Sequence, residues 1–229
     1  MALRYSYKIN DKVLMTQLTA SEPVFRKAMD QVAQKAFFEP AVAALKRDFD
    51  EDKVTQEIKG GTSSTNITKT LRGKFAGAMN PNLWGFIGLE GDPEQALEAV
   101  EERLEPGHPE GPQMIYRKGA KTRLEFIYEV KAPSLSAIYN DKRTHFPWLK
   151  GISWVKRIEQ GIPGITRFQN ISVAASRSGG GIQMKNSLRK GGSQKGQARF
   201  VPRGYLSPMF NNFLRRVAAR KPTGRSPLS

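Results

Sequence analysis

The last acidic residue of this 229-residue chain is Glu159, and the seventy residues after it carry thirteen Lys or Arg. Divided after Gln113, the first part has 14 basic and 17 acidic side chains, and the second has 23 and 4. The net charge of +16 is therefore the sum of −3 over residues 1–113 and +19 over residues 114–229. Because crowded cations repel one another, the second part needs an anion from elsewhere. The pattern predicts a polyanionic partner, either nucleic acid or an acidic protein surface.

Composition excludes several classes of protein. The length and twelve Phe, six Tyr and three Trp allow a real hydrophobic core. The chain has no Cys, which excludes disulfides, thiolate zinc sites and iron–sulfur clusters, and we expect no cofactor. The first residues lack the apolar region of a secretory leader, and no apolar stretch is long enough to span a membrane. We therefore expect no contact with a membrane.

Enzyme motifs are scarce. His108 and His145 are interpreted as exposed loop residues without metal-ligand spacing, and no Gly-x-Ser-x-Gly motif is present. The Gly-rich stretches at 176–181 and 191–196 lack the phosphate-loop pattern. The acidic cluster Asp48, Asp50, Glu51 and Asp52 leaves a metal-dependent nuclease as an alternative, but a patch that pairs with a basic neighbour is favoured. We expect that the protein is not an enzyme.

Periodicity predicts an α+β fold of antiparallel hairpins, separate packed helices and long extended loops. Hairpins are predicted for residues 5–15 and 114–130, and an extended loop with short strands for 53–84. Helices are predicted from Ser21, interrupted at Pro40, from Asp92, from Ser134, over 147–158, and from Ser207. The first of these helices carries an apolar stripe of Val24, Ala28, Val32, Ala36 and Phe37. We predict a core over residues 1–165 and a basic region over 166–229, both within one domain.

The basic region supplies the predicted contact residues. They form a distributed stripe with few aromatic residues, so we expect contact with DNA phosphate or acidic protein without reading of bases. A flexible loop at 176–181 and this stripe are the predicted contact elements, and the stripe consists of Arg177, Lys185, Arg189, Lys190, Lys195, Arg199 and Arg203.

Two apolar segments are predicted to form either core or interface. Trp84 and Phe86 lie in an apolar segment bordered by Gly, which is costly to leave in water. Phe210 and Phe213 share a face of the last predicted helix, and Arg216 follows in its basic half. This helix either docks onto another molecule or closes the core of its own domain.

A further signal comes from short segments spread over roughly the middle two-thirds of the chain. They are Val54-Thr55-Gln56-Glu57-Ile58 with Gly60, Asn66-Ile67-Thr68-Lys69-Thr70-Leu71-Arg72-Gly73, Asn82-Leu83-Trp84-Gly85-Phe86-Ile87-Gly88-Leu89, Gly91-Asp92-Pro93, Pro147-Trp148, Gly151-Ile152-Ser153-Trp154, Ile158-Glu159-Gln160-Gly161-Ile162, Ser176-Arg177-Ser178-Gly179 and Gly181-Ile182-Gln183. Together they resemble virion proteins of tailed bacteriophages, in particular neck or head-to-tail joining proteins of the tail-completion or terminator type. The run Lys74 to Pro81 departs from that pattern, which is shorter there.

The resemblance implies a structural virion protein, assembled in the host cytoplasm, that forms a six- or twelve-fold ring between portal and tail. Its partners would be copies of itself, neighbouring portal, neck or tail proteins, and DNA in the channel. Head-to-tail pairing of the two oppositely charged parts of the chain suits such a ring. The alternative is a nonspecific nucleic-acid-binding protein that uses the acid-free basic region.

Overall fold

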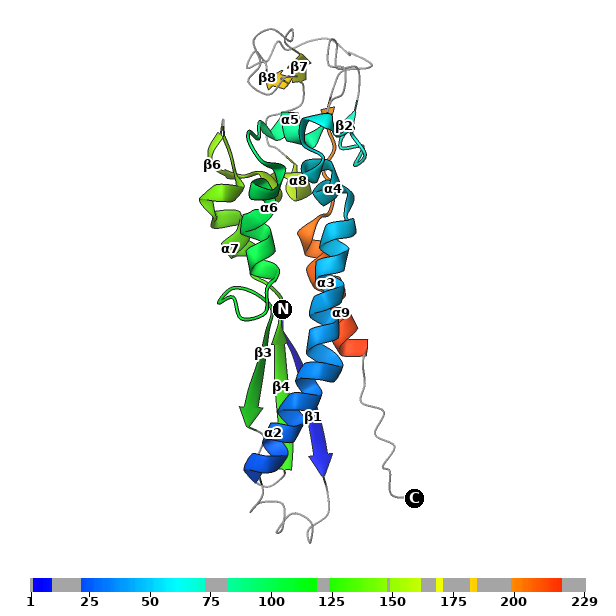
Figure 1. Ribbon diagram of the computed structural model, residues 1–229, viewed down its shortest axis with the longest axis vertical. Coiled ribbons are helices and arrows are strands. Elements are labelled where there is room, and N and C mark those ends of the chain that lie inside the picture. The colour runs from blue at the N-terminus through cyan, green and yellow to red at the C-terminus, as the bar shows by residue number, and fades with distance from the viewer. Residues whose placement is uncertain are drawn as a thin grey trace. The chain divides into compact units, whose positions relative to one another are not determined.

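The structure is a computed structural model that describes residues 2–9, 22–72, 82–118, 124–147, 149–161, 168–170, 182–184 and 199–219. It confirms the α+β class, because helices alternate with small antiparallel sheets (Figure 1). The chain forms two compact units. Unit 1 contains Met1–Arg47, Arg103–Pro133 and Met209–Ser229, and unit 2 contains Asp48–Glu102 and Ser134–Pro208. The predicted division of the chain at residue 165 stays a prediction.

Unit 1 is built on a three-stranded antiparallel sheet in the order β1-β4-β3. The predicted hairpin over 114–130 is confirmed, since β3 (Gln113–Lys118) pairs with β4 (Leu124–Lys131) and Tyr116 lies opposite Tyr128. Strand β1 (Ala2–Ile9) pairs with the other edge of β4 along its whole length. The second strand predicted for residues 13–15 lies outside the described residues.

Helix α2 (Glu22–Val32) packs on this sheet through one side only. Met29 and Ala33 contact the cluster formed by Phe126 and Tyr128. The Tyr128 hydroxyl donates a hydrogen bond of 2.8 Å to Asp30. Val24 and Val32, from the predicted apolar stripe, are 71% and 49% exposed. The stripe therefore does not face the core of unit 1, because Met29, Asp30 and Ala33 on another side of the helix make the contacts with the sheet.

The interruption of the helix predicted at Pro40 takes the form of a π-helical segment just before it, after which the α-helix restarts. The chain passes from α2 through a π-helical segment, η1 (Ala33–Phe38), into α3 (Glu39–Glu51). At their junction the Glu39 N–H donates to the carbonyl of Gln34, five residues earlier. A proline has no N–H and its ring crowds the preceding turn, and a locally widened turn accommodates both effects.

Unit 2 is a set of short helices and two-stranded sheets. Its helices are α4 (Lys53–Lys59), η2 (Gly61–Ser63), α5 (Leu83–Ile87), α6 (Pro93–Glu101), α7 (Leu135–Asn140), η4 (Lys142–Thr144) and α8 (Trp154–Gln160), and η3 (Glu102–Leu104) follows α6. Its strand pairs are β2 (Leu71–Arg72) with β9 (Arg199–Phe200), β5 (His145–Phe146) with β6 (Leu149–Ser153), and β7 (Phe168–Asn170) with β8 (Ile182–Met184).

Two predicted helix starts in unit 2 are confirmed by side-chain caps. The Asp92 carboxylate accepts a hydrogen bond of 2.9 Å from the Glu94 N–H, and Pro93 opens α6. The Ser134 hydroxyl accepts from the Ala137 N–H at 3.3 Å and begins α7. In both cases a short polar side chain satisfies a backbone donor that the helix leaves without a partner.

Two predictions for unit 2 were wrong. Residues 53–63 are helical rather than extended, since Asp52 caps α4 and η2 follows it, and Asn82 caps α5, whereas the predicted short strand is present as β2. Residues 147–153 are not helical, and the helix begins only at Trp154, where the Ser153 hydroxyl accepts from the Lys156 N–H. Gly151 has a φ of 75°, a left-handed conformation that a right-handed helix cannot contain.

The start of helix α9 (Leu206–Ala219) is held by Glu159, the last acidic residue of the chain. Its Oε1 accepts from the N–H groups of Tyr205 at 3.2 Å and Ser207 at 2.7 Å. Its Oε2 accepts from the hydroxyls of Tyr139 at 2.7 Å and Ser207 at 2.6 Å. Ser207 was predicted to cap this helix. The helix instead begins at Leu206, one residue before Ser207, and Glu159, which lies on α8, accepts the hydrogen bonds at its start.

We predict that Glu159→Ala lowers the free energy of unfolding by about 2–4 kcal/mol, because the four groups that donate hydrogen bonds to this carboxylate lose their acceptor. Glu159→Gln should cost less, because its amide oxygen still accepts. The measurement is urea unfolding followed by circular dichroism. Glu51→Ala is the control, since Glu51 is exposed and its replacement should change stability by less than about 0.5 kcal/mol. Equal stability of the Glu159→Ala and control variants would contradict the role of Glu159.

Candidate contact surface

Most of the predicted basic contact residues lie outside the described residues. These are Arg177, Lys185, Arg189, Lys190 and Lys195, and the flexible loop at 176–181 lies there as well. Arg199 lies in β9, where only the backbone is described. Arg203 is half-buried in unit 2, and its N–H donates to the carbonyl of Ile158 at 2.8 Å. Its charge lowers the pKa of Asp52, although burial outweighs this effect and raises that pKa overall.

The structure shows that the chain before and after the acid-free segment 162–199 meets at one place in unit 2. A Cβ atom on Gly161 would lie 2.9 Å from Cγ of Pro202, so the two backbones are neighbours. The returning chain is fixed by the Val201 N–H, which donates to Thr70 at 2.7 Å, and by Arg203. Residues 162–199, here called the basic excursion, contain seven Lys or Arg and no Asp or Glu. Seven positive charges therefore lie on one closed excursion of the chain.

The predicted aromatic contact residues are buried. Trp84 and Phe86 are 2% and 3% exposed, and Phe86 stacks on Phe200 with ring centroids 5.1 Å apart. Phe210 is buried as well, and Phe213 meets Phe38 edge-to-face at 6.4 Å. The core interpretation that the sequence left open therefore describes these four side chains. Arg216 is half-buried in α9, and docking of this helix onto another molecule stays a prediction.

A buried carboxylate organises the polar interior of unit 2. Glu57, on α4, has no exposed surface. One of its oxygens accepts from the Leu83 N–H at 2.7 Å and the other from the Thr68 N–H at 2.8 Å. Burial raises the pKa of Glu57, and the bonds with Thr68 and Leu83 oppose that rise. Glu57 thus joins α4, the loop before β2 and the start of α5.

The loop between η2 and β2 is braced from several sides. The Asn82 side chain donates to the carbonyl of Ser64 at 2.7 Å, and its oxygen accepts from the Gly85 N–H. The Thr68 and Thr70 hydroxyls share a hydrogen bond of 2.9 Å. Within this loop Lys69 has a φ of 58°, a conformation that a lysine adopts only where the surroundings hold it. The loop is therefore a fixed structure rather than a passive connection.

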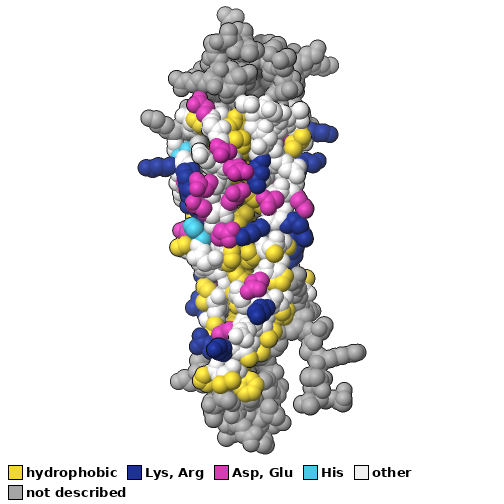
Figure 2. All heavy atoms as spheres, viewed as in Figure 1, with side chains coloured by type: hydrophobic (Ala, Val, Ile, Leu, Met, Phe, Trp, Pro, Cys, Tyr) yellow, Lys and Arg dark blue, Asp and Glu magenta, His cyan; other side chains and the backbone are white. Residues whose placement is uncertain are grey.

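One side of α6 forms an acidic face, which we define as Glu94, Glu98, Glu101 and Glu102 together with Asp50. The four Glu residues follow a helical spacing that places them on one side, and Figure 2 shows acidic side chains gathered over α6. Lys59 connects Asp50 and Glu101, at 2.9 and 3.3 Å. The chain from 48 to 102 contains eleven acidic and five basic residues. The face therefore keeps a negative charge after its internal pairs are formed.

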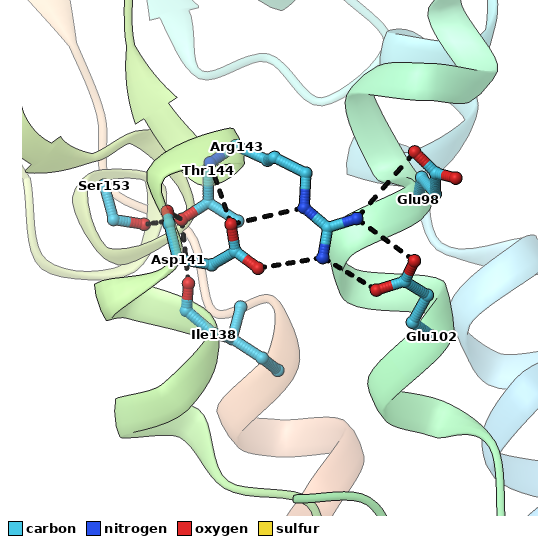
Figure 3. Close-up of polar contacts among 7 residues, drawn as sticks. All are labelled: Glu98, Glu102, Ile138, Asp141, Arg143, Thr144 and Ser153. Atoms are coloured by element: carbon cyan, nitrogen blue, oxygen red, sulfur yellow. Dashed lines mark hydrogen bonds and ion pairs between the residues drawn. The ribbon is translucent and has the colours of Figure 1, made fainter. Parts of the chain in front are cut away.

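Arg143 is a cation held between three carboxylates at this face (Figure 3). Its guanidinium donates to both oxygens of Glu102, at 3.1 and 2.7 Å, and to Asp141 at 3.3 and 3.0 Å. Glu98 lies 3.8 Å away. The fork of the guanidinium matches a carboxylate with two parallel bonds, which fixes η4 against the acidic face.

The acidic run from Asp48 to Asp52 does not form a convergent site in the structure. Asp52 accepts from the Val54 N–H at 2.7 Å, and Asp50 pairs with Lys59. Across the described ranges, no three His, Asp or Glu side chains are placed to share a metal ion. In the same ranges, none of the helices combines the length and apolar character needed to cross a bilayer.

Comparisons with known proteins found no matching family model, no matching curated protein and no matching solved structure.

Sequence reasoning did not single out Glu57 or Arg143 as organising residues. Glu57 had a signal, since it stands beside Val54 and Ile58 on the buried side of a seven-residue helix where an apolar residue would be expected. Arg143 had none, because its carboxylate partner Glu102 is forty-one residues away in the chain.

We predict that Glu57→Ala lowers the free energy of unfolding by about 2–4 kcal/mol, because two buried N–H groups lose their acceptor. Glu57→Gln should lose less, since its amide oxygen can replace one of the two bonds. Urea unfolding measures both effects. A Glu57→Ala variant as stable as the wild-type protein would contradict the network.

We also predict how the difference in stability between the wild-type protein and Glu57→Gln changes with pH. A raised pKa in the folded state means that Glu57 contributes most stability below its ordinary pKa and loses that contribution as the pH rises through the raised value. The stability of the wild-type protein relative to Glu57→Gln should therefore fall as the pH rises from the ordinary pKa of a glutamate through the neutral range. Unfolding midpoints across that range measure it. A difference that grows with pH would show that the bonds outweigh burial.

Proposed function

We propose that this chain is a structural virion protein of a tailed bacteriophage. It forms a ring at the neck, the head-to-tail connector or the tail terminus, and joins the portal side to the tail. It assembles in the host cytoplasm and is carried in the virion, with portal, neck or tail proteins as neighbours. DNA in the channel is a further contact, made without regard to sequence, and the role involves no catalysis.

The observation that carries this proposal is the separation of charge within one chain. The acidic face lies on α6, and the seven cations of the basic excursion stand on a segment without a single carboxylate. Contact between the acidic face of one copy and the basic excursion of the next is a head-to-tail interface, which closes into a ring when the rotation between copies allows it. In a closed ring of six or twelve copies, the acidic face and the basic excursion of every copy would each contact a neighbouring copy.

The Glu57 network supports the resemblance on which the virion assignment rests. Three of the segments that carry the resemblance, 54–58, 66–73 and 82–89, are separate in sequence. Glu57 belongs to the first and binds Thr68 of the second and Leu83 of the third. The residues that carry the resemblance in these three segments therefore meet in one part of unit 2.

We predict that purified protein, freed of nucleic acid in high salt, forms rings of uniform subunit number when it is returned to moderate salt. High salt should dissociate them, because it screens the contacts between exposed charges. Negative-stain microscopy and light scattering measure the subunit number and the particle mass. A charge-neutral variant of the basic excursion, Arg189→Gln with Lys190→Gln, should shift assembly to higher protein concentration.

The alternative function, nonspecific nucleic-acid binding, gives a different outcome. Monomers would then bind DNA of any sequence, with a slope of log affinity against log salt of about −6 if all seven cations of the excursion met phosphates. Monomers at every salt concentration that do not bind DNA would contradict both functions.

A further inference from the structure

Helix α2 exposes an apolar surface that unit 1 does not use. Val24, Phe25 and Val32 are 71%, 40% and 49% exposed, and Ala28 between them is exposed too. Among the described residues only one other large apolar side chain, Ile67, is exposed to a similar degree. Figure 2 shows hydrophobic side chains at the surface near the lower end of the described part, where Figure 1 places α2. A concentration of exposed apolar residues on one helix is typical of an interaction surface.

The exposed stripe is distinct from the side of the helix that unit 1 buries. The sheet is contacted by Met29 and Ala33, and Arg26 lies over the Tyr116 ring, 4.5 Å from its centroid. Val24, Ala28 and Val32 recur every four residues and so form a line along the remaining surface. The packing of unit 1 therefore does not account for these three residues.

The charges beside the stripe are positive. Lys27 and Lys35 are exposed along the same stretch of helix. Asp30, the only acidic residue between positions 23 and 38, is half-buried, accepts from Tyr128 and pairs with Arg26. An occupant of this surface therefore has to bring carboxylates to the rim of an apolar contact.

Self-pairing of two α2 helices does not meet that requirement. An antiparallel pair centred on Ala28 would place Val24 of each copy beside Val32 of the other. The same arrangement would bring the two Lys27 side chains together at the two-fold axis, and like charges facing each other across an interface oppose association. The charge pattern of α2 therefore favours a different, acidic surface as its partner.

We propose that the outward face of α2 docks on the acidic face of a second copy of this chain. The inference rests on the proposed ring and names a second contact within it, beside the one made by the basic excursion. Lys27 and Lys35 approach Glu94 and Glu98 of the next copy, which are exposed and lie toward the start of α6, and the basic excursion meets the rest of the acidic face. Val24, Ala28 and Val32 form the apolar centre of the contact. Because the two surfaces differ, each copy offers one to each neighbour, as a ring requires.

A charge exchange tests this contact. Variant A carries Lys27→Glu with Lys35→Glu, and variant B carries Glu94→Lys with Glu98→Lys. Each alone should raise the protein concentration for half-assembly at least about tenfold, which is the effect of losing two favourable contacts. A chain with all four changes restores opposite charges across the interface and should assemble near the wild-type concentration. Light scattering and negative-stain microscopy give the readout, and unfolding midpoints verify that each variant is folded.

Two further variants separate the apolar contribution from net charge. Val24→Ser with Val32→Ser should also weaken assembly, whereas Val32→Leu should not. The matched control is Arg47→Glu with Lys156→Glu, which changes the net charge as variant A does at exposed positions that belong neither to α2 nor to the acidic face. This control should assemble as the wild-type protein does.

The outcomes distinguish this inference from the function on which it rests. If the wild-type protein does not assemble, the proposed ring fails and the inference fails with it. If it assembles and variants A and B assemble equally well, only the inference is overturned. If variants A and B fail but their combination does not recover, the acidic face is not the occupant and the inference is again overturned. Recovery of assembly by the four changes together supports it.

Discussion

The carboxylate of Glu159 accepts four hydrogen bonds, and the arrangement of unit 2 around it depends on them. Tyr139 of α7 and the first residues of α9 all donate to this group, which stands on α8. Helix α9 leaves backbone donors at its first turn, and a negative charge there also suits the positive end of the helix dipole. Because Glu159 is the last acidic residue, no later residue of the chain could supply that carboxylate. The final acid of the sequence is used inside the fold.

Glu57 shows the same device in the middle of unit 2. A fully buried carboxylate is costly, and burial raises its pKa, yet its two oxygens satisfy N–H groups eleven and twenty-six residues away. Acidic residues in this protein thus serve two purposes. Glu57 and Glu159 hold backbone segments in place, whereas Glu94 and Glu98 remain exposed at the surface, where Glu98 also lies 3.8 Å from Arg143.

Local signals predicted the elements whose causes are local. Asp92 with Pro93, Ser134 and the hairpin over 114–130 each carry their cap or alternation within a few residues. Sequence reasoning missed α4, whose seven residues depend on Asp52 as a cap and on the bonds of Glu57 to distant donors. The charge separation was visible in composition and the spacing of the Glu residues on α6 in the sequence, but the pairing of Arg143 with Glu102 arises from a contact that no periodicity encodes.

The meeting of Gly161 and Pro202 has a consequence for how the chain tolerates change. Since the excursion leaves and returns at one point, its ends stay together whatever the length between them. Closing a loop twice as long costs only about 0.6 kcal/mol more. Insertions or deletions at residues 171–181, between β7 and β8, therefore leave the strand pair β2–β9 and the Glu159 contacts intact. The excursion can therefore change in length while its supporting scaffold stays the same, as long as its seven cations are kept for the contact proposed above.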